Sequence, residues 1–324
     1  MKRIAVLTSG GDAPGMNACI RAVVRTALHY GIEVTGIRRG YQGIIEGDFI
    51  PMDRSSVSGI IHLGGTILRS ARCEDFRLEA GRQKAHEQLQ KADIDKIVVI
   101  GGDGSFRGAL NLMKEFPDIQ MVGCPGTIDN DLFGTDYTIG YDTAINTAMN
   151  AIDNIKDTAN AHDRLFFIEV MGRDVGYIAL PVGIATGAEA ILIPETKMGI
   201  EQLVESLEYN FQRKKNSSIV VVAEGDEEGG AFKIAEEVKK RSFNRYEIKV
   251  TILGHIQRGG RPTCIERVRA SRLGMAAVQA LLDNKNAVMI GEVNGQIVHT
   301  PFEKATKHHM DINPMLLEMV EILS

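Results

Sequence analysis

The stretch PGTIDND, residues 125–131, carries two carboxylates, Asp129 and Asp131, one residue apart and just after an apolar run. If this stretch continues extended from a strand, Thr127, Asp129 and Asp131 project to one side, because side chains alternate along a strand. A hydroxyl and two carboxylates so placed suit phosphoryl transfer, in which a carboxylate receives the proton of the acceptor hydroxyl. Asp129, the central residue, is the candidate base. An Asx turn with both acids in solvent explains the same residues equally well.

Two glycine-rich loops each follow an expected strand and precede an expected helix: TSGGDAPG at residues 8–15 and GGDGS at residues 101–105. Glycines allow backbone N–H groups to approach an anion closely, and the N-terminus of the following helix adds partial positive charge. A tight turn between strand and helix would use the same glycines. The presence of two such loops favours phosphate binding.

The loops do not match the common nucleotide-binding patterns. The chain has no GxxxxGK[ST] segment, and Gly102 and Gly104 are followed by Gly108, which misses GxGxxG. The next strand ends at Cys124 and not at an acid that would bind a ribose. The sequence therefore disfavours a P-loop protein and a dinucleotide-dependent dehydrogenase.

Asp103 lies inside the second glycine loop, where its carboxylate cannot serve the core. An acid beside bound phosphates is costly unless a cation lies between them, and Mg²⁺ is held by one or two carboxylates together with phosphate oxygens. The sequence therefore favours Asp103 as a metal ligand over the alternative, a helix N-cap.

Three arginines lie at the ends of expected strands: Arg72, Arg173 and Arg258. Each one alone is better explained as a solvated surface residue, but several together fit an oxyanion-rich ligand. His255 lies in the same GHIQRGG segment as Arg258. A structural histidine explains it as well as a functional one.

Strands and helices alternate along the whole chain, and this pattern predicts how the polar residues are positioned. Strands are expected at residues 4–7, 34–37, 97–100, 121–124, 165–170, 190–193, 219–223 and 249–253. Helices are expected at residues 17–30, 79–92, 106–116, 142–158, 263–282 and 312–323, and also between the last four of these strands. Asn294-Gly295 predicts a hairpin. Such alternation predicts an α/β fold with parallel sheets covered on both faces. Ligands bind at the carboxyl ends of such strands, where the motifs above fall.

Length and composition set outer limits on the function. The 324 residues suit two α/β domains, and 44% hydrophobic with 24% charged residues is an ordinary globular composition. A net charge of −5 gives no general basic footprint for nucleic acid. The four cysteines fit neither a zinc site nor a disulfide framework, so we expect reduced thiols in a cytosolic protein. No segment has the pattern of a signal peptide or a membrane helix.

With these motifs assembled, the chain resembles the bacterial ATP-dependent 6-phosphofructokinase family nearly from end to end. The resemblance is carried by LTSGGDAPGMNA, IGGDGS, PGTIDND, IEVMGR, ILIPE, VVVAEG, ILGHIQRGG and PTCIERVRASRLG. GGDGS alone is unspecific, whereas PGTIDND, MGR and GHIQRGG in this order are highly specific. The resemblance implies a glycolytic phosphotransferase. It would move the γ-phosphate of MgATP to the 1-hydroxyl of fructose 6-phosphate and give fructose 1,6-bisphosphate and ADP.

The resemblance also implies an α/β architecture of two Rossmann-like three-layer domains with mainly parallel sheets and the active site in the cleft between them. Residues 1–140 and 257–308 would form the larger, ATP-binding domain. Residues 141–256 and 309–324 would form the smaller, fructose 6-phosphate-binding domain. The implied cofactor is Mg²⁺, and the implied assembly is a cytoplasmic homotetramer with active and effector sites at its subunit interfaces. No nucleic acid or membrane partner is expected.

The family's motifs assign roles to residues of the reaction centre. Asp129 would be the general base with Thr127 beside it, and Arg72 and Arg173 would stabilise the transferring phosphoryl group. Asp103 would hold Mg²⁺. ATP would be contacted by Gly11, Arg72, Cys73, Gly102, Asp103, Gly104 and Ser105.

The motifs also place the sugar phosphate. Fructose 6-phosphate would meet Thr127, Ile128, Asp129, Met171, Gly172, Arg173, Glu224, His255, Ile256, Gln257 and Arg258. Arg164 and Lys249 would reach its 6-phosphate from a neighbouring subunit. Lys249 replaces the commoner arginine, and lysine keeps the charge but loses the bidentate fork.

Two glycines bear on the phosphoryl donor. Family members that use pyrophosphate tend to carry Asp at the position of Gly104 and Lys at the position of Gly126. Glycine at both positions leaves room for the α-phosphate of ATP, so ATP is the expected donor. A non-catalytic nucleotide sensor on the same fold would be expected to lack Asp129 or Arg173, and both are present.

A second, regulatory site is implied at a subunit interface, for a nucleoside diphosphate or phosphoenolpyruvate. Its residues would be Arg21, Arg25, Arg54, Lys156, Gly187, Glu189, Arg213, Lys215, Asn216 and Ser217. The chain departs from the family at Lys156, where arginine is usual, at Gly59, where some members have aspartate, and at Ser217, often histidine. Without the resemblance, Arg21 and Arg25 are best explained as one solvated helix face.

Overall fold

The computed structural model describes residues 3–159, 164–196, 198–212, 218–241, 247–308 and 312–323. The chain divides into two compact units, a larger one of Met1–Thr143 with Arg258–His308 and a smaller one of Ala144–Gln257 with His309–Ser324. The sequence placed these divisions after residues 140 and 256, and contacts within the chain place them after 143 and 257. The assignment of ATP to the larger unit and fructose 6-phosphate to the smaller one stays a prediction.

An eight-stranded, mainly parallel sheet forms the centre of the larger unit. Its strands are β1 (Arg3–Thr8), β2 (Glu33–Ile37), β3 (Phe49–Met52), β4 (Lys96–Gly101), β5 (Gln120–Thr127), β6 (Ile139–Gly140), β11 (Val288–Val293) and β12 (Gln296–Pro301). The order is β12-β11-β5-β4-β1-β2-β3, and β6 pairs with the end of β5. Only the outer strands β3 and β12 run antiparallel to their neighbours.

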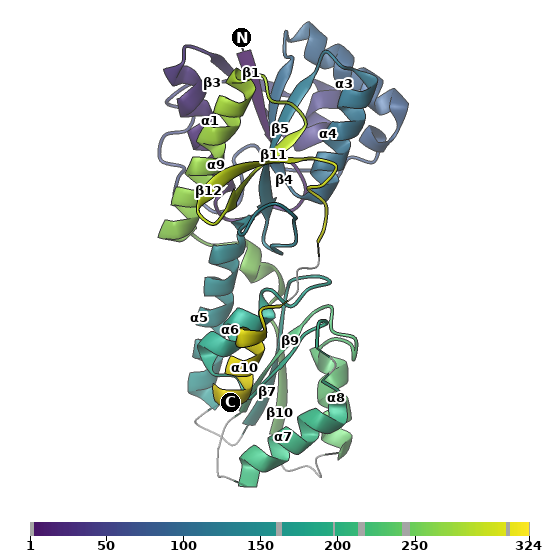
Figure 1. Ribbon diagram of the computed structural model, residues 1–324, viewed down its shortest axis with the longest axis vertical. Helices are drawn as coiled ribbons and strands as arrows, with labels where there is room; N and C mark the ends of the chain where they lie inside the picture. The colour runs from purple at the N-terminus through teal and green to yellow at the C-terminus, as the bar shows by residue number, and fades with distance from the viewer. Residues whose placement is uncertain are drawn as a thin grey trace. The chain divides into compact units, whose positions relative to one another are not determined.

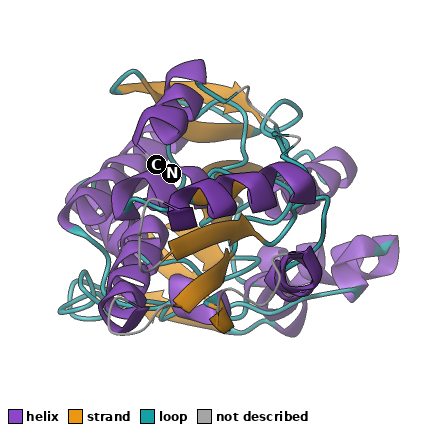
Figure 2. Ribbon diagram, turned by 90° about the horizontal axis from the view of Figure 1, so that it is seen from below, coloured by secondary structure: helices purple, strands orange, loops and turns teal. Residues whose placement is uncertain are grey.

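Helices cover both faces of this sheet (Figures 1 and 2). They are α1 (Met16–His29), α2 (Gly40–Glu46), α3 (Glu79–Lys91), α4 (Asp103–Glu115) and α9 (Cys264–Leu282), with a 3₁₀ turn η1 at Asp75–Arg77. On one face, alternate residues such as Leu7 and Val99 pack in one core with Leu89 of α3 and Phe106 of α4. On the other face α1 packs against α9. Gly274 makes this approach possible, because a Cβ there would lie 2.7 Å from the carbonyl oxygen of Cys19.

The smaller unit has a four-stranded parallel sheet of order β10-β7-β9-β8. Its strands are β7 (Arg164–Val170), β8 (Ala190–Leu192), β9 (Ser218–Ala223) and β10 (Glu247–Ile252). Its helices are α5 (Tyr141–Ala159, which starts in the larger unit), α6 (Ala179–Thr186), α7 (Ile200–Gln212), α8 (Ala231–Arg241) and α10 (Pro314–Leu323). A 3₁₀ turn, η2 at Gly254–Arg258, ends in the larger unit with Arg258. In Figure 1, α7 and α8 cover one face of this sheet, and α5, α6 and α10 cover the other.

The expected alternation, the two mainly parallel sheets and the hairpin at Asn294-Gly295 are confirmed. Both hairpin residues have positive φ, as a tight two-residue turn between twisted strands requires. The elements α2, β3, β6, η1 and η2 were not predicted. The helix expected from residue 106 begins three residues earlier, at Asp103.

Candidate functional site

The PGTIDND stretch does not stay extended, so the condition under which its three polar side chains would share one side is not met. β5 ends at Thr127, and Asn130 has the left-handed φ of 55°. The side chain of Asn130 fixes this turn, because its oxygen accepts the N–H of Thr138 at 2.7 Å and its amide donates to the carbonyl of Asp136 at 3.0 Å. The Thr127 hydroxyl accepts the N–H of Asp129 at 3.2 Å.

The turn buries both carboxylates, and the alternative in which both acids lie in solvent is therefore wrong. Asp129 is 1% exposed and Asp131 is 7% exposed. Asp131 lies 3.9 Å from the ammonium of Lys307, and its carbonyl accepts the N–H of His308 at 2.8 Å. Asp131 is thus turned toward the chain that follows β12, while Asp129 stays at the end of β5.

The second glycine loop lies beside Thr127, because β4 and β5 are neighbours in register, with Gly101 opposite Pro125. A Cβ on Gly102 would be 3.9 Å from that of Thr127. A Cβ on Gly104 would meet nothing within 4 Å. The loop backbone is held from behind: the hydroxyl of Tyr41 donates to the carbonyl of Ser105, and Tyr41 stacks on Phe76 with ring centroids 4.1 Å apart.

Asp103 is the first residue of α4, and the N-cap is Gly102, so the N-cap alternative for Asp103 is wrong. Its carboxylate, 10% exposed, accepts two hydrogen bonds from Arg107 one turn later: Nε donates to Oδ1 at 2.9 Å, and Nη2 donates to Oδ2. This pairing raises the pKa of Arg107. The carboxylate is therefore nearly buried and is already paired with a cation.

The first glycine loop connects β1, a strand of the same sheet, to helix α1. Gly15, the N-cap of α1, has a left-handed φ of 100°, which favours glycine. Arg258 reaches this loop: its Nη1 donates to the carbonyl of Asp12 at 3.3 Å and would lie 2.8 Å from a Cβ on Gly11. Arg258 is therefore half-buried against the first glycine loop, and its contact with an anionic ligand stays a prediction.

Arg72 and Cys73 lie in the irregular segment between β3 and η1. Arg72 is exposed. Cys73 is half-buried against the core of the larger unit, and this burial raises the pKa of its thiol. Cys73 is thus a packing residue with a weakly acidic thiol.

In the smaller unit, five predicted substrate residues gather where β7, β9 and β10 end. The Glu224 carboxylate accepts the N–H of Arg173 at 2.7 Å and of Gly172 at 3.3 Å. The Gln257 side-chain oxygen accepts the N–H of Met171 at 2.9 Å. Gly172 and Arg173 have positive φ values of 145° and 54°. Glu224 and Gln257 therefore hold the strained end of β7 in place.

His255 and Ile256 lie in η2, directly before Gln257. Both are exposed, Ile256 by 53%. His255 is therefore not part of the core, and the choice between a structural and a functional role for it stays a prediction. Gln257, in contrast, is fully buried, so it supports its neighbours and leaves contact with solvent to them.

Arg164 and Lys249 lie at the opposite, amino end of the same sheet. Arg164 is the first residue of β7, and its register partner on β10 is Glu247. Glu247 accepts from Arg164 Nε at 2.8 Å and pairs with Lys249 Nζ at 2.7 Å. Hydrogen bonds from Lys249 and then Arg164 lower the pKa of Glu247 to about 2. Two cations thus share one exposed carboxylate.

The predicted effector residues fall in both units. Arg21 and Arg25 lie on α1, and burial together with the charge of Arg25 lowers the pKa of Arg21. Arg54 is exposed after β3. In the smaller unit, Lys156 donates to the carbonyl of Thr186 at 2.7 Å, directly before Gly187. Glu189 is half-buried just before β8. Arg213, Lys215, Asn216 and Ser217 lie outside the described residues.

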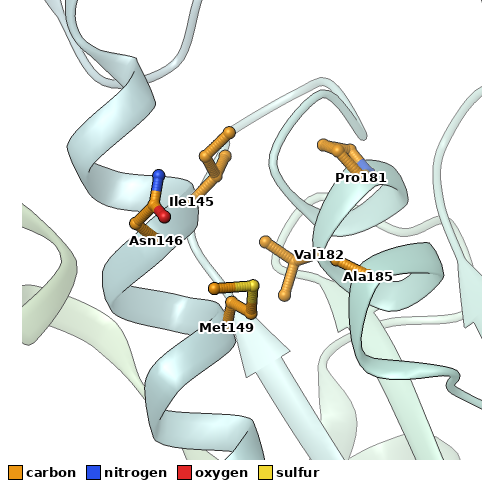
Figure 3. A pocket seen from close by; sticks show the side chains of 6 residues that line it. All are labelled: Ile145, Asn146, Met149, Pro181, Val182 and Ala185. Carbon is orange, nitrogen blue, oxygen red and sulfur yellow. The ribbon is translucent and has the colours of Figure 1, made fainter. Parts of the chain in front are cut away.

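A cavity of about 70 Å³ lies between α5 and α6 (Figure 3). Its walls are Ile145, Asn146, Met149, Pro181, Val182 and Ala185. None of the predicted site residues lines it, and five of its six walls are apolar. It is therefore separate from the polar groups described above.

Comparison with known proteins decides the family. The Phosphofructokinase family model matches residues 3–281. The chain belongs to the phosphofructokinase family. It is 55% identical over 324 residues to ATP-dependent 6-phosphofructokinase 1 of Thermus thermophilus, with all of both chains covered. It is 52% identical to ATP-dependent 6-phosphofructokinase 2 of Bacteroides thetaiotaomicron, over 100% of this chain and 99% of that one.

The fold agrees with this family. Phosphofructokinase from Pichia pastoris in the T-state matches with a TM-score of 0.87 and 36% identity, over 94% of this chain. The match covers 35% of the Pichia chain, so the present chain spans about a third of that length. The resemblance seen in the sequence and the two Rossmann-like domains are confirmed. None of the helices over the described ranges is both long and apolar enough to span a bilayer.

The sequence motifs missed several residues at these sites. Arg107 could have been found, because residues four apart on a helix are neighbours. Glu247 could have been found from its alternation with Lys249 on one strand. Tyr41 gave no local signal, since its partner Ser105 is distant in the sequence.

Proposed function

We propose that this chain is an ATP-dependent 6-phosphofructokinase, which transfers the γ-phosphate of MgATP to the 1-hydroxyl of fructose 6-phosphate. The observation that carries the proposal is a buried carboxylate, Asp129, at the end of β5 beside the glycine loop that follows β4. The full-length identity to enzymes of that name supports the choice of substrates.

Asp129 is the proposed general base. Phosphoryl transfer needs positioning, charge stabilisation and a carboxylate that accepts the proton of the attacking hydroxyl. The turn around Asn130 holds Asp129 in one place, and the Thr127 hydroxyl fixes its backbone N–H. Arg72 and Arg173 would stabilise negative charge on the moving phosphoryl group. Both are exposed, so both are accessible to a ligand.

ATP is the proposed donor, with Gly11, Arg72, Cys73 and the segment from Gly102 to Ser105 as its contacts. The open space above Gly104 supports this choice, since a Cβ there meets no protein atom within 4 Å. Gly126 differs, because a Cβ there would lie 3.0 Å from the side chain of Met16. Glycine at 126 is thus already required by packing, and it argues less strongly about the donor than Gly104 does.

Mg²⁺ is the proposed cofactor, with Asp103 as its protein ligand. Across the described ranges, no group of three or more His, Cys, Asp or Glu side chains could hold a metal. A single carboxylate in a glycine loop fits Mg²⁺, which takes one or two carboxylates and completes its shell with phosphate oxygens and water. When bound, Mg²⁺ would neutralise the phosphate charge that otherwise opposes attack by the hydroxyl.

Fructose 6-phosphate is proposed to bind at the carboxyl ends of β7 and β9, against the segment Met171–Arg173. Glu224 and Gln257 orient that segment, and His255, Ile256 and Arg258 follow it along η2. The backbone of Thr127, Ile128 and Asp129 would present the base to the sugar.

We further propose that the 6-phosphate is bound by Arg164 and Lys249 of another subunit of a cytoplasmic homotetramer. Arg164 begins β7, and Met171 follows its end. A seven-residue strand spans roughly 20 Å, which exceeds the length of the sugar phosphate. One chain's Arg164 therefore cannot reach a sugar held at its own Met171.

A regulatory site for a nucleoside diphosphate or phosphoenolpyruvate is also proposed, on Arg21, Arg25, Arg54, Lys156 and Gly187, with Glu189 and the segment 213–217. The half-buried pair Arg21 and Arg25 supports it, because two neighbouring guanidinium groups attract an oxyanion.

The proposed function is tested by a coupled assay for fructose 1,6-bisphosphate with fructose 6-phosphate and Mg²⁺, run with ATP and, in parallel, with pyrophosphate. We expect product with ATP alone. Product with pyrophosphate would keep Asp129 as the base and overturn the donor. If folded protein gives no product with either donor, the kinase proposal fails and a nucleotide sensor becomes the better explanation, to be tested by direct nucleotide binding.

A further inference from the structure

The carboxylate proposed to hold Mg²⁺ is already bound by a cation of the protein itself. Both oxygens of Asp103 accept hydrogen bonds from the guanidinium of Arg107, one at 2.9 Å. We propose that Arg107 occupies Asp103 in the empty enzyme and is exchanged for Mg²⁺ when the metal arrives with ATP. This inference rests on the proposed function, since it takes Asp103 as the metal ligand.

Asp103 is the fixed member of the pair. It begins α4, and the first turn is closed by the N–H of Ser105 donating to the carbonyl of Gly102 at 2.9 Å. The hydroxyl of Tyr41 also donates to the carbonyl of Ser105, and Tyr41 is itself buried. The side chain of Asp103 is only 10% exposed. A ligand must therefore come to this carboxylate, which cannot move out to meet it.

Arg107 is the member that can leave. Its side chain is 64% exposed, and within the described part of the chain its hydrogen bonds go to Asp103 alone. An exposed arginine loses little when an i,i+4 ion pair opens. The guanidinium fork nevertheless engages both carboxylate oxygens, so a metal that coordinates either oxygen must break at least one of these bonds.

The exchange is expected to depend on the nucleotide. A free metal ion would displace Arg107 into water, and the two cations would repel each other across one carboxylate. Phosphates on the loop at Gly104 change this balance, because Arg107 lies one helical turn, about 5 Å, along α4 from the loop. Asp103 then passes from the guanidinium to the metal, and Arg107 gains phosphate oxygens as its new partners. Asp103 would thus take Mg²⁺ mainly in company with ATP.

The test is a titration of the intact protein with Mn²⁺, followed by the electron paramagnetic resonance signal of the free ion. It is run with and without a non-hydrolysable ATP analogue. Arg107→Gln is expected to bind free Mn²⁺ about three- to tenfold more tightly than the unmodified protein. With the analogue this advantage should shrink or reverse. Lys240→Gln removes an equivalent cation from helix ion pairs with Glu236 and Glu237 in the smaller unit, and it should change neither titration.

Two results would overturn the inference: Arg107→Gln with an unchanged or unmeasurable affinity for free Mn²⁺, or a gain that is equally large with the analogue. Asp103→Asn separates this failure from failure of the metal assignment. If Asp103→Asn abolishes Mn²⁺ binding while Arg107→Gln has no effect, only the exchange is wrong. If Asp103→Asn leaves Mn²⁺–nucleotide binding unchanged in a protein with normal thermal unfolding, Asp103 is not the metal ligand.

Discussion

Two glutamates, one in each unit, have pKa values shifted in opposite directions. Glu266, near the start of α9 in the larger unit, is 2% exposed, and burial raises its pKa to about 7. Its carboxylate accepts hydrogen bonds from the backbone N–H and the hydroxyl of Thr143, each at 3.3 Å. Glu247, at the start of β10 in the smaller unit, is exposed, and hydrogen bonds from Lys249 and Arg164 lower its pKa to about 2.

The same contrast separates the proposed catalytic residues from the proposed phosphate-binding ones. Asp129 is a buried carboxylate on a hydrogen-bonded turn, and Asp103 is a buried carboxylate at the first residue of α4. Arg164 and Lys249 are cations near the amino end of the smaller sheet, paired with a carboxylate that the proposed phosphate would have to replace. Groups that stabilise a transition state work best when they are fixed in advance, whereas groups that capture an anion must be accessible. On the proposed function, Asp129 and Asp103 of the larger unit would serve the first task, and Arg164 and Lys249 of the smaller unit would serve the second.

The largest effect is expected from Asp129→Asn, which removes the proposed base and keeps the shape of the side chain. Loss of a general base lowers kcat by about 10²- to 10⁴-fold. Steady-state kinetics with MgATP would measure this loss, and circular dichroism would check the fold. Asp131→Asn is the matched control, with an expected loss under about tenfold, since Asp131 is turned toward Lys307. Equal losses in the two variants would remove the distinction between these carboxylates.

Glu266→Gln tests the buried carboxyl of the larger unit through pH. The folded pKa of about 7 lies above the ordinary value of 4.5. Folding therefore favours the protonated form, and the stability this gives is complete below pH 4.5 and is lost as pH rises through 7. Glutamine cannot ionise. We expect the variant to gain up to about 3 kcal/mol relative to the unmodified protein between pH 4.5 and pH 8.

Urea unfolding at several pH values measures this gain as the difference between the two free energies of unfolding. If the free energies of unfolding of the two proteins change with pH in the same way, Glu266 has its ordinary pKa in the folded protein. The contrast between the raised pKa of Glu266 and the lowered pKa of Glu247 would then be lost.

Arg164→Gln tests the exposed cations of the smaller unit. A hydrogen bond to a charged group contributes about 1.5–3 kcal/mol, so the KM for fructose 6-phosphate should rise roughly 10- to 100-fold, with kcat changed much less. Glu247→Gln removes the competing carboxylate, and it should lower that KM a few-fold. A rise in KM for Glu247→Gln as large as that for Arg164→Gln would show that the carboxylate orients the cations and does not compete with phosphate.

The smallest effect is expected from Gly104→Asp. The protein has room for this side chain, so thermal unfolding should stay the same. A carboxylate beside the phosphates should raise the KM for ATP roughly tenfold by like-charge repulsion. Gly104→Ala is the matched control without charge and should leave that KM nearly unchanged. If both variants raise the KM for ATP equally, the side chain at position 104 weakens ATP binding by its size and not by its charge.

The parts of the fold that could be predicted from the sequence are those with strong local signals. Apolar runs such as residues 97–100 and 219–223 predict buried parallel strands. The glycine loops mark the carboxyl ends of the strands, where Asp103 and Asp129 lie. The turn at Asn130 could not be predicted, because hydrogen bonds to Asp136 and Thr138, residues further along the chain, determine it. The short strand β3 could not be predicted from the sequence, because its pairing with β2 stabilises it and Pro51 within it is untypical of a strand.

The larger unit is assembled from two separated parts of the chain, and this has a consequence for how the protein is made. β5 has β11 as its neighbour, with Val288 opposite Val122, and β12 closes that edge. During synthesis the whole smaller unit except its last helix leaves the ribosome before β11 does. Until then β5 presents an unpaired edge, the kind of surface that invites aggregation. Long-range pairing of this type also slows folding. The sheet of the larger unit, although it begins at the first strand of the chain, therefore closes only after most of the smaller unit has been made.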